Sequence, residues 1–201
     1  MTDPTPPPTH GSPPMPRMTD LLTPGLPAGI TLPEPLTRAW AWMEAQGFGL
    51  TNEHGHFLTP YPGDRQLGVV FSPGASLTGW FEPGEPGHDD LVPLGEIAGD
   101  GSQCLLWNDS GTTRFVALGS DGAAFLLADS AIDFLRLIAI GYTDIAYPEF
   151  LAEPPDEEDA VQALAPFRAW VEAEFDVEVP EHWRAADPDP FDSWIAHLKD
   201  R

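Results

Sequence analysis

The strongest constraint on the fold of this chain is a run of short apolar segments separated by turn signals between residues 48 and 128. Gly, Asn and Asp recur where the chain must reverse, and these residues tolerate the positive φ of tight turns. Short connections favour antiparallel pairing of consecutive strands, so the sequence predicts an antiparallel sheet of sequential hairpins. The expected strands are residues 48–51, 56–59, 67–71, 77–81, 91–97, 103–107, 114–118 and 123–127.

Helical patterns flank this run. Before it, apolar residues recur with helical spacing until Gly47, at Leu36, Ala39, Trp40 and Met43. After it, Ser130 and Asp133 form a capping-box-like pair at the start of an apolar helix that ends at Gly141. This second helix has few charged residues and is expected to be largely buried behind the sheet.

Two further helices are predicted near the C-terminus. One spans roughly residues 156–176, where Pro166 must either kink it or open a second helix. The last begins with Asp189 as its cap and Pro190 in its first turn. Asp189 belongs to an acidic cluster with calcium-loop-like spacing, but a helix cap explains the cluster better because the EF-hand Gly and Glu are missing. The predicted fold class is therefore α+β, with helices packed on one side of an antiparallel sheet.

The N-terminus has a different composition, because 11 of the 24 prolines fall in residues 1–35. Proline lacks a backbone donor and restricts the preceding residue, so a packed element is not expected there. Residues 1–20 are predicted to be a disordered Pro-rich tail and residues 21–201 a single domain. A solvated leader is the first interpretation of the tail, and a proline-rich ligand or adaptor segment is the alternative.

Charge excludes two classes of partner. The 32 acidic and 9 basic residues give a net charge of −23, which cannot supply a basic face for nucleic acid or for an anionic membrane. The single cysteine, Cys104, forms no internal disulfide and is expected to be buried and inert. We find neither a signal-peptide pattern nor an apolar run of the ~20 residues that a membrane span needs, so a cytoplasmic protein is expected.

Motifs for catalysis are not found, and we expect no enzyme and no cofactor. The chain has no phosphate-binding glycine loop and no nucleophile elbow. His54 and His56 have the most metal-like spacing, and a third ligand would have to come from His88, Asp89 or Asp90. A small metal- or ligand-binding protein that uses His54 and His56 is the alternative function, although a turn with exposed histidines is the more economical interpretation.

The acidic residues are concentrated towards the C-terminus. Residues 142–201 carry a net charge of −12, against −11 for the preceding 141 residues. Such a surface either keeps the protein soluble or steers a basic partner. The candidate partner-binding residues occupy a loop and the start of a helix, where acids are also favoured by the helix dipole. They are Trp80, Glu82, Glu85, Asp89 and Asp90 in the loop, and Asp156, Glu157, Glu158 and Asp159 before the helix.

The central part of the chain resembles a known family. Residues 94–103 (LGEIAGDGSQ), 105–107 (LLW), 115–122 (FVALGSDG) and 128–141 (ADSAIDFLRLIAIG) are similar to the later part of SUKH-superfamily proteins, and residues 167–175 resemble the helix that often follows. That family includes bacterial toxin-immunity proteins and regulators of cell-wall synthesis. The N-terminal half departs from the family's usual opening, and only residues 36–46 match its helix.

The resemblance implies an α+β binding module without catalysis. Some members of the family are immunity proteins that bind and block a cognate toxin, often a nuclease with a basic active site. The expected function is therefore non-catalytic binding of a basic protein partner, in keeping with the acidic charge.

Overall fold

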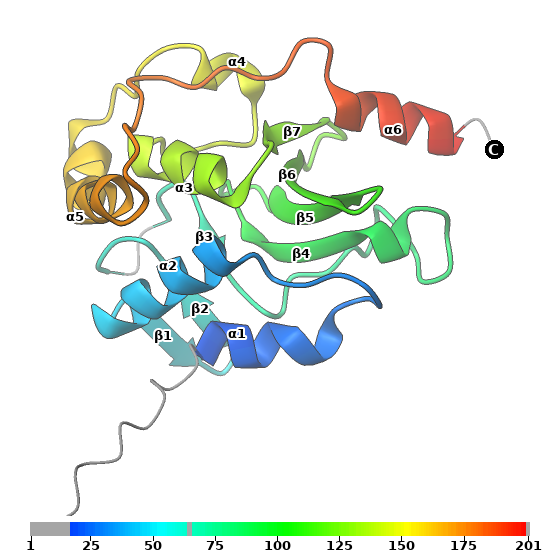
Figure 1. Cartoon of the computed structure of the whole chain (residues 1–201), viewed down its shortest axis with the longest axis horizontal. Coiled ribbons are helices and arrows are strands. Elements are labelled where there is room, and N and C mark those ends of the chain that lie inside the picture. The colour runs from blue at the N-terminus through cyan, green and yellow to red at the C-terminus, as the bar shows by residue number, and fades with distance from the viewer. Residues whose placement is uncertain (1–16, 64–65, 200–201) are drawn as a thin grey trace, which may run out of the picture.

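A seven-stranded antiparallel sheet forms the centre of the protein, and its spatial strand order is its sequence order (Figure 1). The computed structural model describes residues 17–63 and 66–199. The predicted fold class, an antiparallel sheet of sequential hairpins with helices, is confirmed. The strands are β1 (Gly49–Asn52), β2 (Gly55–Leu58), β3 (Val70–Phe71), β4 (Leu91–Glu96), β5 (Gln103–Asp109), β6 (Thr112–Leu118) and β7 (Ala124–Ala128).

The β5–β6 hairpin shows how local sequence sets the register. Ser110 and Gly111 form the two-residue loop, and their φ values of 52° and 94° match a turn whose twist suits paired strands. Asp109 lies opposite Thr112, and the ladder continues to the pair Gln103 and Leu118. Turn signals of this kind explain why most of the predicted strands are found within a residue or two of their expected positions.

The prediction of a strand at residues 77–81 is wrong. The N–H groups of Trp80 and Phe81 both donate to the carbonyl oxygen of Leu77, which forms a helical turn. This i, i+3, i+4 spacing brings all three side chains into one hydrophobic cluster, whereas a strand would direct them to both faces. Strand β3 is also shorter than expected, because Gly68 has a φ of 64° and its N–H bonds to the Thr143 carbonyl.

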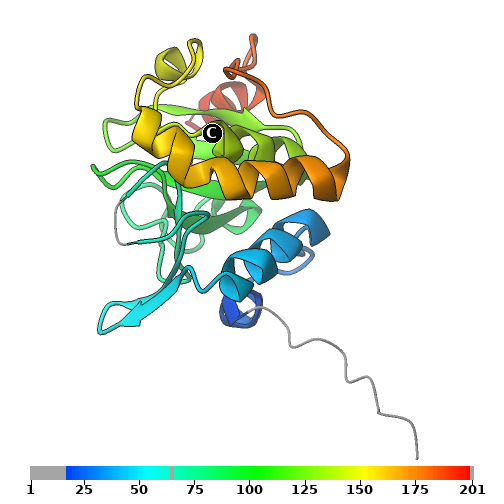
Figure 2. The ribbon, with the colours of Figure 1, turned by 90° about the vertical axis from the view of Figure 1, so that its left-hand side faces the viewer.

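Helices occupy both ends of the chain and cover the sheet (Figures 1 and 2). Helices α2 (Glu34–Ala45), α3 (Ala131–Ile140) and α5 (Glu158–Phe175) pack on one face, where they form the main core with Phe71, Leu94 and Phe115 of the sheet. In this core the rings of Phe115 and Phe134 stack with centroids 4.3 Å apart. The helices are α1 (Arg17–Leu22), α2 (Glu34–Ala45), α3 (Ala131–Ile140), α4 (Pro148–Leu151), α5 (Glu158–Phe175) and α6 (Pro190–Lys199), with short 3-10 turns η1 (Thr23–Gly25) and η2 (His88–Asp90).

Helix α6 departs from the one-sided arrangement, because it packs on the opposite face of the sheet. Its Phe191 and Ile195 form a second core with Leu105 and Trp107 of β5. The residues that alternate with Leu105 and Trp107 along β5 face the main core. Alternating side chains of a strand point to opposite faces, so apolar residues at consecutive positions of β5 require a cover on each side. The apolar stripe of α6 supplies the second cover.

The predicted end of the disordered tail at residue 20 is wrong. Residues 17–20 were expected to be disordered, but they form the start of α1. Glu44 of α2 accepts hydrogen bonds from the N–H groups of Arg17 and Met18 at 2.7 and 2.8 Å, which satisfies free donors of that helix start. This cap comes from a residue 26 positions away and has no local signature. The rest of the predicted tail, residues 1–16, lies outside the described residues.

The predicted helix boundaries are confirmed where capping residues mark them. Ser130 accepts a hydrogen bond from the N–H of Asp133 at the start of α3, and Gly141 ends that helix with a φ of 104°. At α6, Asp189 accepts from the N–H groups of Phe191 and Asp192. Pro166 lies within the single helix α5 rather than opening a new one. Proline has no N–H to donate to the carbonyl group of Gln162, one turn earlier in the helix. Both residues are on the exposed side of α5.

Candidate functional site

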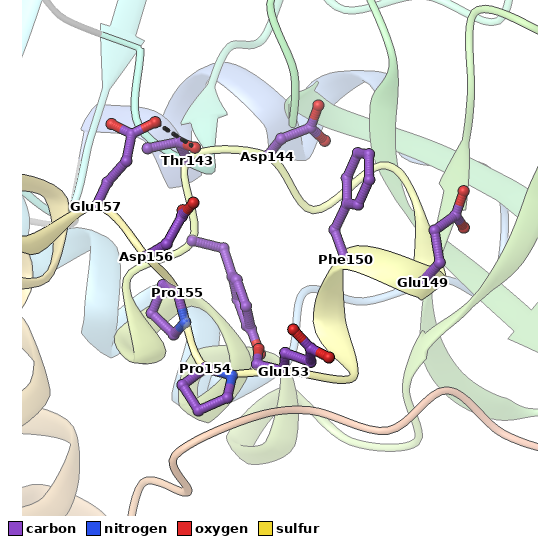
Figure 3. Close-up of a pocket in the computed structure, with 10 residues that line it drawn as sticks. Thr143, Asp144, Glu149, Phe150, Glu153, Pro154, Pro155, Asp156 and Glu157 are labelled. Atoms are coloured by element: carbon purple, nitrogen blue, oxygen red, sulfur yellow. Dashed lines mark hydrogen bonds between the residues drawn. The ribbon is translucent and has the colours of Figure 1, made fainter.

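A cavity of about 360 Å³ lies between the end of α3, helix α4 and the segment that enters α5 (Figure 3). We call it the acidic pocket. The chain turns into it at Gly141, where an added Cβ would lie 2.9 Å from Cα of Val161 in α5. Only glycine allows this close approach of α3 and α5. The residues that line the pocket are Tyr142, Thr143, Asp144, Glu149, Phe150, Glu153, Pro154, Pro155, Asp156 and Glu157.

Carboxylates dominate the lining. Five of the ten lining residues are acidic and none is basic. Four arginines elsewhere in the described residues are already paired with acids: Arg38 with Glu34 and Glu174, Arg114 with Asp109 and Asp129, Arg136 with Asp133, and Arg168 with Glu172. None of the ion pairs among the described residues includes a carboxylate of the pocket. Their negative charge is therefore available to a ligand.

Phe150 is the most exposed large hydrophobic residue among those described, with 57% of its surface accessible. Its ring makes an edge contact with Tyr147, at a centroid distance of 5.5 Å. In Figure 3 the ring lies between the carboxylates of Asp144 and Glu149. An exposed aromatic ring among carboxylates offers both an apolar surface and negative charge at one place.

Tyr142 holds the floor of the acidic pocket in place. Its buried hydroxyl oxygen lies 2.7 Å from the Leu151 carbonyl oxygen and 2.9 Å from that of Glu153, and it accepts a hydrogen bond from the Trp183 N–H. Burial raises the pKa of this hydroxyl above its ordinary value, so it remains a neutral donor. One side chain thus connects α3, the turn after α4 and the segment before α6.

Asp144 is the least solvated carboxylate of the pocket. It accepts a hydrogen bond of 2.7 Å from the Ala146 N–H, yet its pKa is raised above the ordinary value. Burial is the main cause, and the negative charge of Asp100 adds to it. A cation bound nearby would favour the charged form of Asp144, so the electrostatics of the site favour a positively charged ligand.

Asp100 joins two glycine-rich turns, residues 99–101 and 119–122. Its Oδ1 accepts hydrogen bonds from the N–H and Oγ of Ser102, and its Oδ2 accepts from the hydroxyls of Ser120 and Tyr147. These bonds hold the pKa of Asp100 well below its usual range, with the Ser102 hydroxyl as the largest cause. The Gly-Asp-Gly and Gly-Ser-Asp-Gly motifs therefore meet in space, and through Tyr147 they support one side of the acidic pocket.

The structure divides the predicted partner-binding residues. Asp156 and Glu157 line the acidic pocket, while Glu158 and Asp159 are exposed in the first turn of α5. Glu157 reaches back to the pocket, where its carboxylate lies 3.4 Å from the Thr143 hydroxyl (Figure 3). Two of the four predicted acids before the helix, Asp156 and Glu157, thus share the pocket with Asp144, Glu149 and Glu153.

The loop group lies elsewhere. Its residues belong to the segment between β3 and β4, which lies beside α6 at the opposite end of the molecule from α5 (Figure 1). Trp80 is half-buried against the second core and lines a separate groove with Glu85. Glu82 and Asp89 are exposed, and Asp90 is partly buried in η2. The two predicted groups therefore do not form a single site.

His54 and His56 do not converge. His56 is buried, its Nδ1 lies 3.0 Å from the Thr51 hydroxyl, and its Nε2 faces Glu44 at 4.0 Å. His54 is exposed in the turn of the β1–β2 hairpin, and the Asn52 side chain accepts a hydrogen bond from its N–H. Within residues 17–63 and 66–199, no group of three His, Cys, Asp or Glu residues is placed to hold a metal ion. The His54/His56 alternative therefore lacks a ligand set there.

The predicted burial of Cys104 is confirmed. Cys104 is fully buried, and burial raises the pKa of its thiol far above the ordinary value, as expected for an inert core cysteine. Among the described helices, none has both the length and the apolar character required to cross a lipid bilayer.

Phe150 and Tyr147 were missed by the sequence analysis. Both lie between predicted helices, in a stretch without periodic pattern. The available signal was an aromatic pair three residues apart, followed by Pro154-Pro155 and four consecutive acids. Such spacing predicts a short helical turn, but the exposure of a side chain depends on what packs over it.

Comparison with known proteins gives no match: no family model, no curated protein and no solved structure is similar to this chain at a significant level.

Proposed function

We propose that this chain is a non-catalytic protein-binding module that captures a basic protein partner at the acidic pocket. The observation that supports this most directly is the exposure of Phe150 within a pocket of five unpaired carboxylates. A single exposed aromatic ring is common on protein surfaces, so it is the combination of the ring with the carboxylates around it that supports a binding role. The functional unit is thus the surface formed by α4 and the segment before α5.

Lysine and arginine side chains match this surface. A guanidinium group can stack on the exposed face of an aromatic ring while its N–H groups reach carboxylates on either side. Asp144 and Glu149 flank the Phe150 ring in the position for such contacts (Figure 3). The half-buried position of Asp144 strengthens the attraction, because water screens the interaction less there.

The resemblance to SUKH proteins directs the proposal to one kind of partner. An immunity protein that blocks a basic, nuclease-type toxin needs an acidic surface that complements the cationic cleft of the toxin. The net charge of −23 would accelerate the encounter and disfavour acidic competitors. A cytoplasmic location, where such a toxin acts, is part of the same proposal.

The test compares two triple variants that each remove three negative charges. The pocket variant carries Glu153→Gln, Asp156→Asn and Glu157→Gln, and the loop variant carries Glu82→Gln, Glu85→Gln and Asp89→Asn. The probe is a synthetic peptide of alternating Arg and Gly, titrated by calorimetry at rising salt. We expect weak binding to the unmodified chain that falls with salt, because exposed charge pairs are screened.

The pocket variant should lose most of this binding, and the loop variant should lose only the part that reflects net charge. Phe150→Ala should weaken binding without any change of charge, which separates the ring from the carboxylates. Equal losses in the two triple variants, or full binding by Phe150→Ala, would contradict the assignment of the partner to the acidic pocket.

A further inference from the structure

The two edges of the sheet differ in how their backbone groups are satisfied. On β7, the N–H of Leu126 donates to Oδ2 of Asp189 at 2.8 Å, and the carbonyl of Leu127 accepts from Nε1 of Trp183 at 2.8 Å. Both side chains come from the segment that leads to α6. They occupy the outer edge of β7, so a further strand cannot pair there without displacing them.

Strand β1 has no such cover. It pairs with β2 on one side, and within residues 17–63 and 66–199 no hydrogen bond reaches the backbone groups on its outer edge. All four of its residues are exposed, including Leu50 at 50%. Figure 2 shows the β1–β2 hairpin projecting from the body of the molecule. Backbone donors and acceptors in an open edge are a template for pairing with another chain.

The sheet face beside this edge carries apolar side chains that the described part of the chain leaves uncovered. Leu50 lies directly opposite Phe57 in the β1–β2 ladder, so both side chains are on the same face, away from buried His56 and Leu58. With Val70 they line a cavity of about 220 Å³. Helix α6 covers the same face over β5 to β7 but does not extend to this end. An apolar face and an open edge thus adjoin.

We propose that this edge pairs with the same edge of a second copy of the chain, β1 antiparallel to β1, to form a continuous sheet across a two-fold axis. A two-fold axis perpendicular to the sheet generates an antiparallel ladder from two identical strands. The same axis brings the two Leu50 side chains close together beside the two apolar faces. The interface would bury both the open backbone groups and the exposed leucines.

The distribution of charge favours a second copy of the chain as the partner at the β1 edge. Two chains of net charge −23 repel each other, so only a face with few acids can approach a copy of itself. Strand β1 has no charged residue, and Glu96 is the one acid that lines the adjoining cavity. The acidic pocket, with five carboxylates, could not pair with itself in this way. A basic partner, by contrast, has more to gain at the pocket than at β1.

The expected salt dependence is opposite to that of the proposed function. Added salt screens the repulsion between two acidic copies, so self-association should tighten as salt rises. Capture of a basic partner should weaken over the same range. The two proposals can therefore fail independently.

The test is sedimentation velocity on the full chain over a range of protein and salt concentrations. We expect a monomer–dimer equilibrium. Leu50→Lys should raise the dimer dissociation constant by about tenfold or more, because a two-fold interface loses the buried leucine twice and gains two unpaired charges. Leu50 is exposed in the monomer, so this variant should fold normally. Phe150→Lys is the matched control, since it makes the same change of charge at another exposed apolar residue and should leave dimerisation unchanged.

A second measurement follows the backbone directly. Hydrogen exchange of the β1 amides should slow as protein concentration rises, while the exchange of β7 amides should not change. A monomer at every concentration and salt would overturn the proposal. So would a dimer that persists unaltered in Leu50→Lys, because its interface would lie elsewhere.

Discussion

The hydroxyl of Ser120 donates a 2.7 Å hydrogen bond to Oδ2 of Asp100, which connects two glycine-rich turns 20 residues apart in sequence. The buried hydroxyl of Ser102 strengthens the link, since it donates to Asp100 and accepts from the N–H of Ser120. The β4–β5 and β6–β7 turns are thus held together at one end of the sheet. This contact gives both turn motifs a structural role that is independent of any partner.

Replacing Asp100 with Ala should destabilise the fold, because four hydrogen bonds to its carboxylate are lost. We expect a decrease of about 1–3 kcal/mol in the free energy of unfolding, measured by urea denaturation. Asp156→Ala is the control, since that exposed carboxylate makes no hydrogen bond or ion pair with the described residues and its loss should have a small effect. Equal effects of the two substitutions would show that the Asp100 contacts contribute little.

The Asp100 contribution should also depend on pH. Its hydrogen bonds favour the carboxylate and lower its pKa below the ordinary value of 3.8. The unfolded chain therefore binds a proton more readily, and the stabilisation is present above that value and decreases as pH falls below it. The stability difference between the unmodified chain and Asp100→Asn should shrink in this acidic range. A difference that stays constant there would contradict the assignment.

Removing the Tyr142 hydroxyl should loosen the acidic pocket. Tyr142→Phe removes the hydroxyl that lies beside the Leu151 and Glu153 carbonyls and accepts from the Trp183 N–H, although the Trp183 N–H keeps its direct hydrogen bond to the Leu151 carbonyl. We expect a loss of about 1–3 kcal/mol in stability and faster amide exchange in residues 151–157. Tyr147→Phe, which alters a more exposed hydroxyl, should affect exchange in this segment less. If Tyr147→Phe increased amide exchange in residues 151–157 more than Tyr142→Phe, Tyr142 would not be the residue that holds the pocket in place.

Acidification should destabilise the protein through His56. Burial, with a further contribution from Arg17, lowers the pKa of His56 below 6.5, and Glu44 opposes this only in part. The unfolded chain then binds more protons than the folded chain below about pH 6.5, so stability falls as pH decreases through this value. His56→Gln should reduce the fall in urea midpoint between about pH 7.5 and about pH 5.5. His54→Gln, at an exposed site in the same hairpin, should keep the full fall; a His56→Gln profile identical to that of the unmodified chain would refute this origin.

Asp189 should contribute at two places. Its Oδ1 caps α6 and its Oδ2 occupies the outer edge of β7. Asp189→Ala should therefore cost about 1–3 kcal/mol of unfolding free energy and should expose an edge strand that promotes aggregation on heating. Asp189→Asn keeps an acceptor for the cap and should cost less. An alanine variant as stable as the unmodified chain would argue against both roles.

Much of the fold is encoded in short segments of sequence. The β5–β6 hairpin and helix α3 are examples, because Ser110-Gly111 adopts its own turn and Ser130 and Gly141 mark the helix ends. Local patterns were misleading where a segment is shaped by distant contacts. Residues 77–81 have apolar residues suited to a strand, yet they fold into a helical turn under α6. Similarly, the start of α1 depends on a cap from Glu44.

The candidate site was predicted only in part. Asp156 and Glu157 were identified from the concentration of charge, but the pocket requires Asp144, Glu149 and Phe150 as well. The predicted residues of the loop lie far from the pocket, because the order of the strands in the sheet places the β3–β4 connection at the opposite end of the molecule from α5. Charge composition indicates that an acidic surface exists, and it contains no information about which acids are neighbours.

The sequence by itself determined the order of the strands found in the sheet, the capped ends of α3 and the start of α6, and the excess of negative charge, because turns, local caps and ionisation depend on residues close together in the chain. Tertiary structure alone decided that Phe150 remains exposed, that α6 covers the second face of the sheet, and that Asp189 and Trp183 protect β7 while no described residue covers the outer edge of β1. These outcomes depend on which distant segments pack over a residue, and packing between distant segments leaves no local pattern in the sequence.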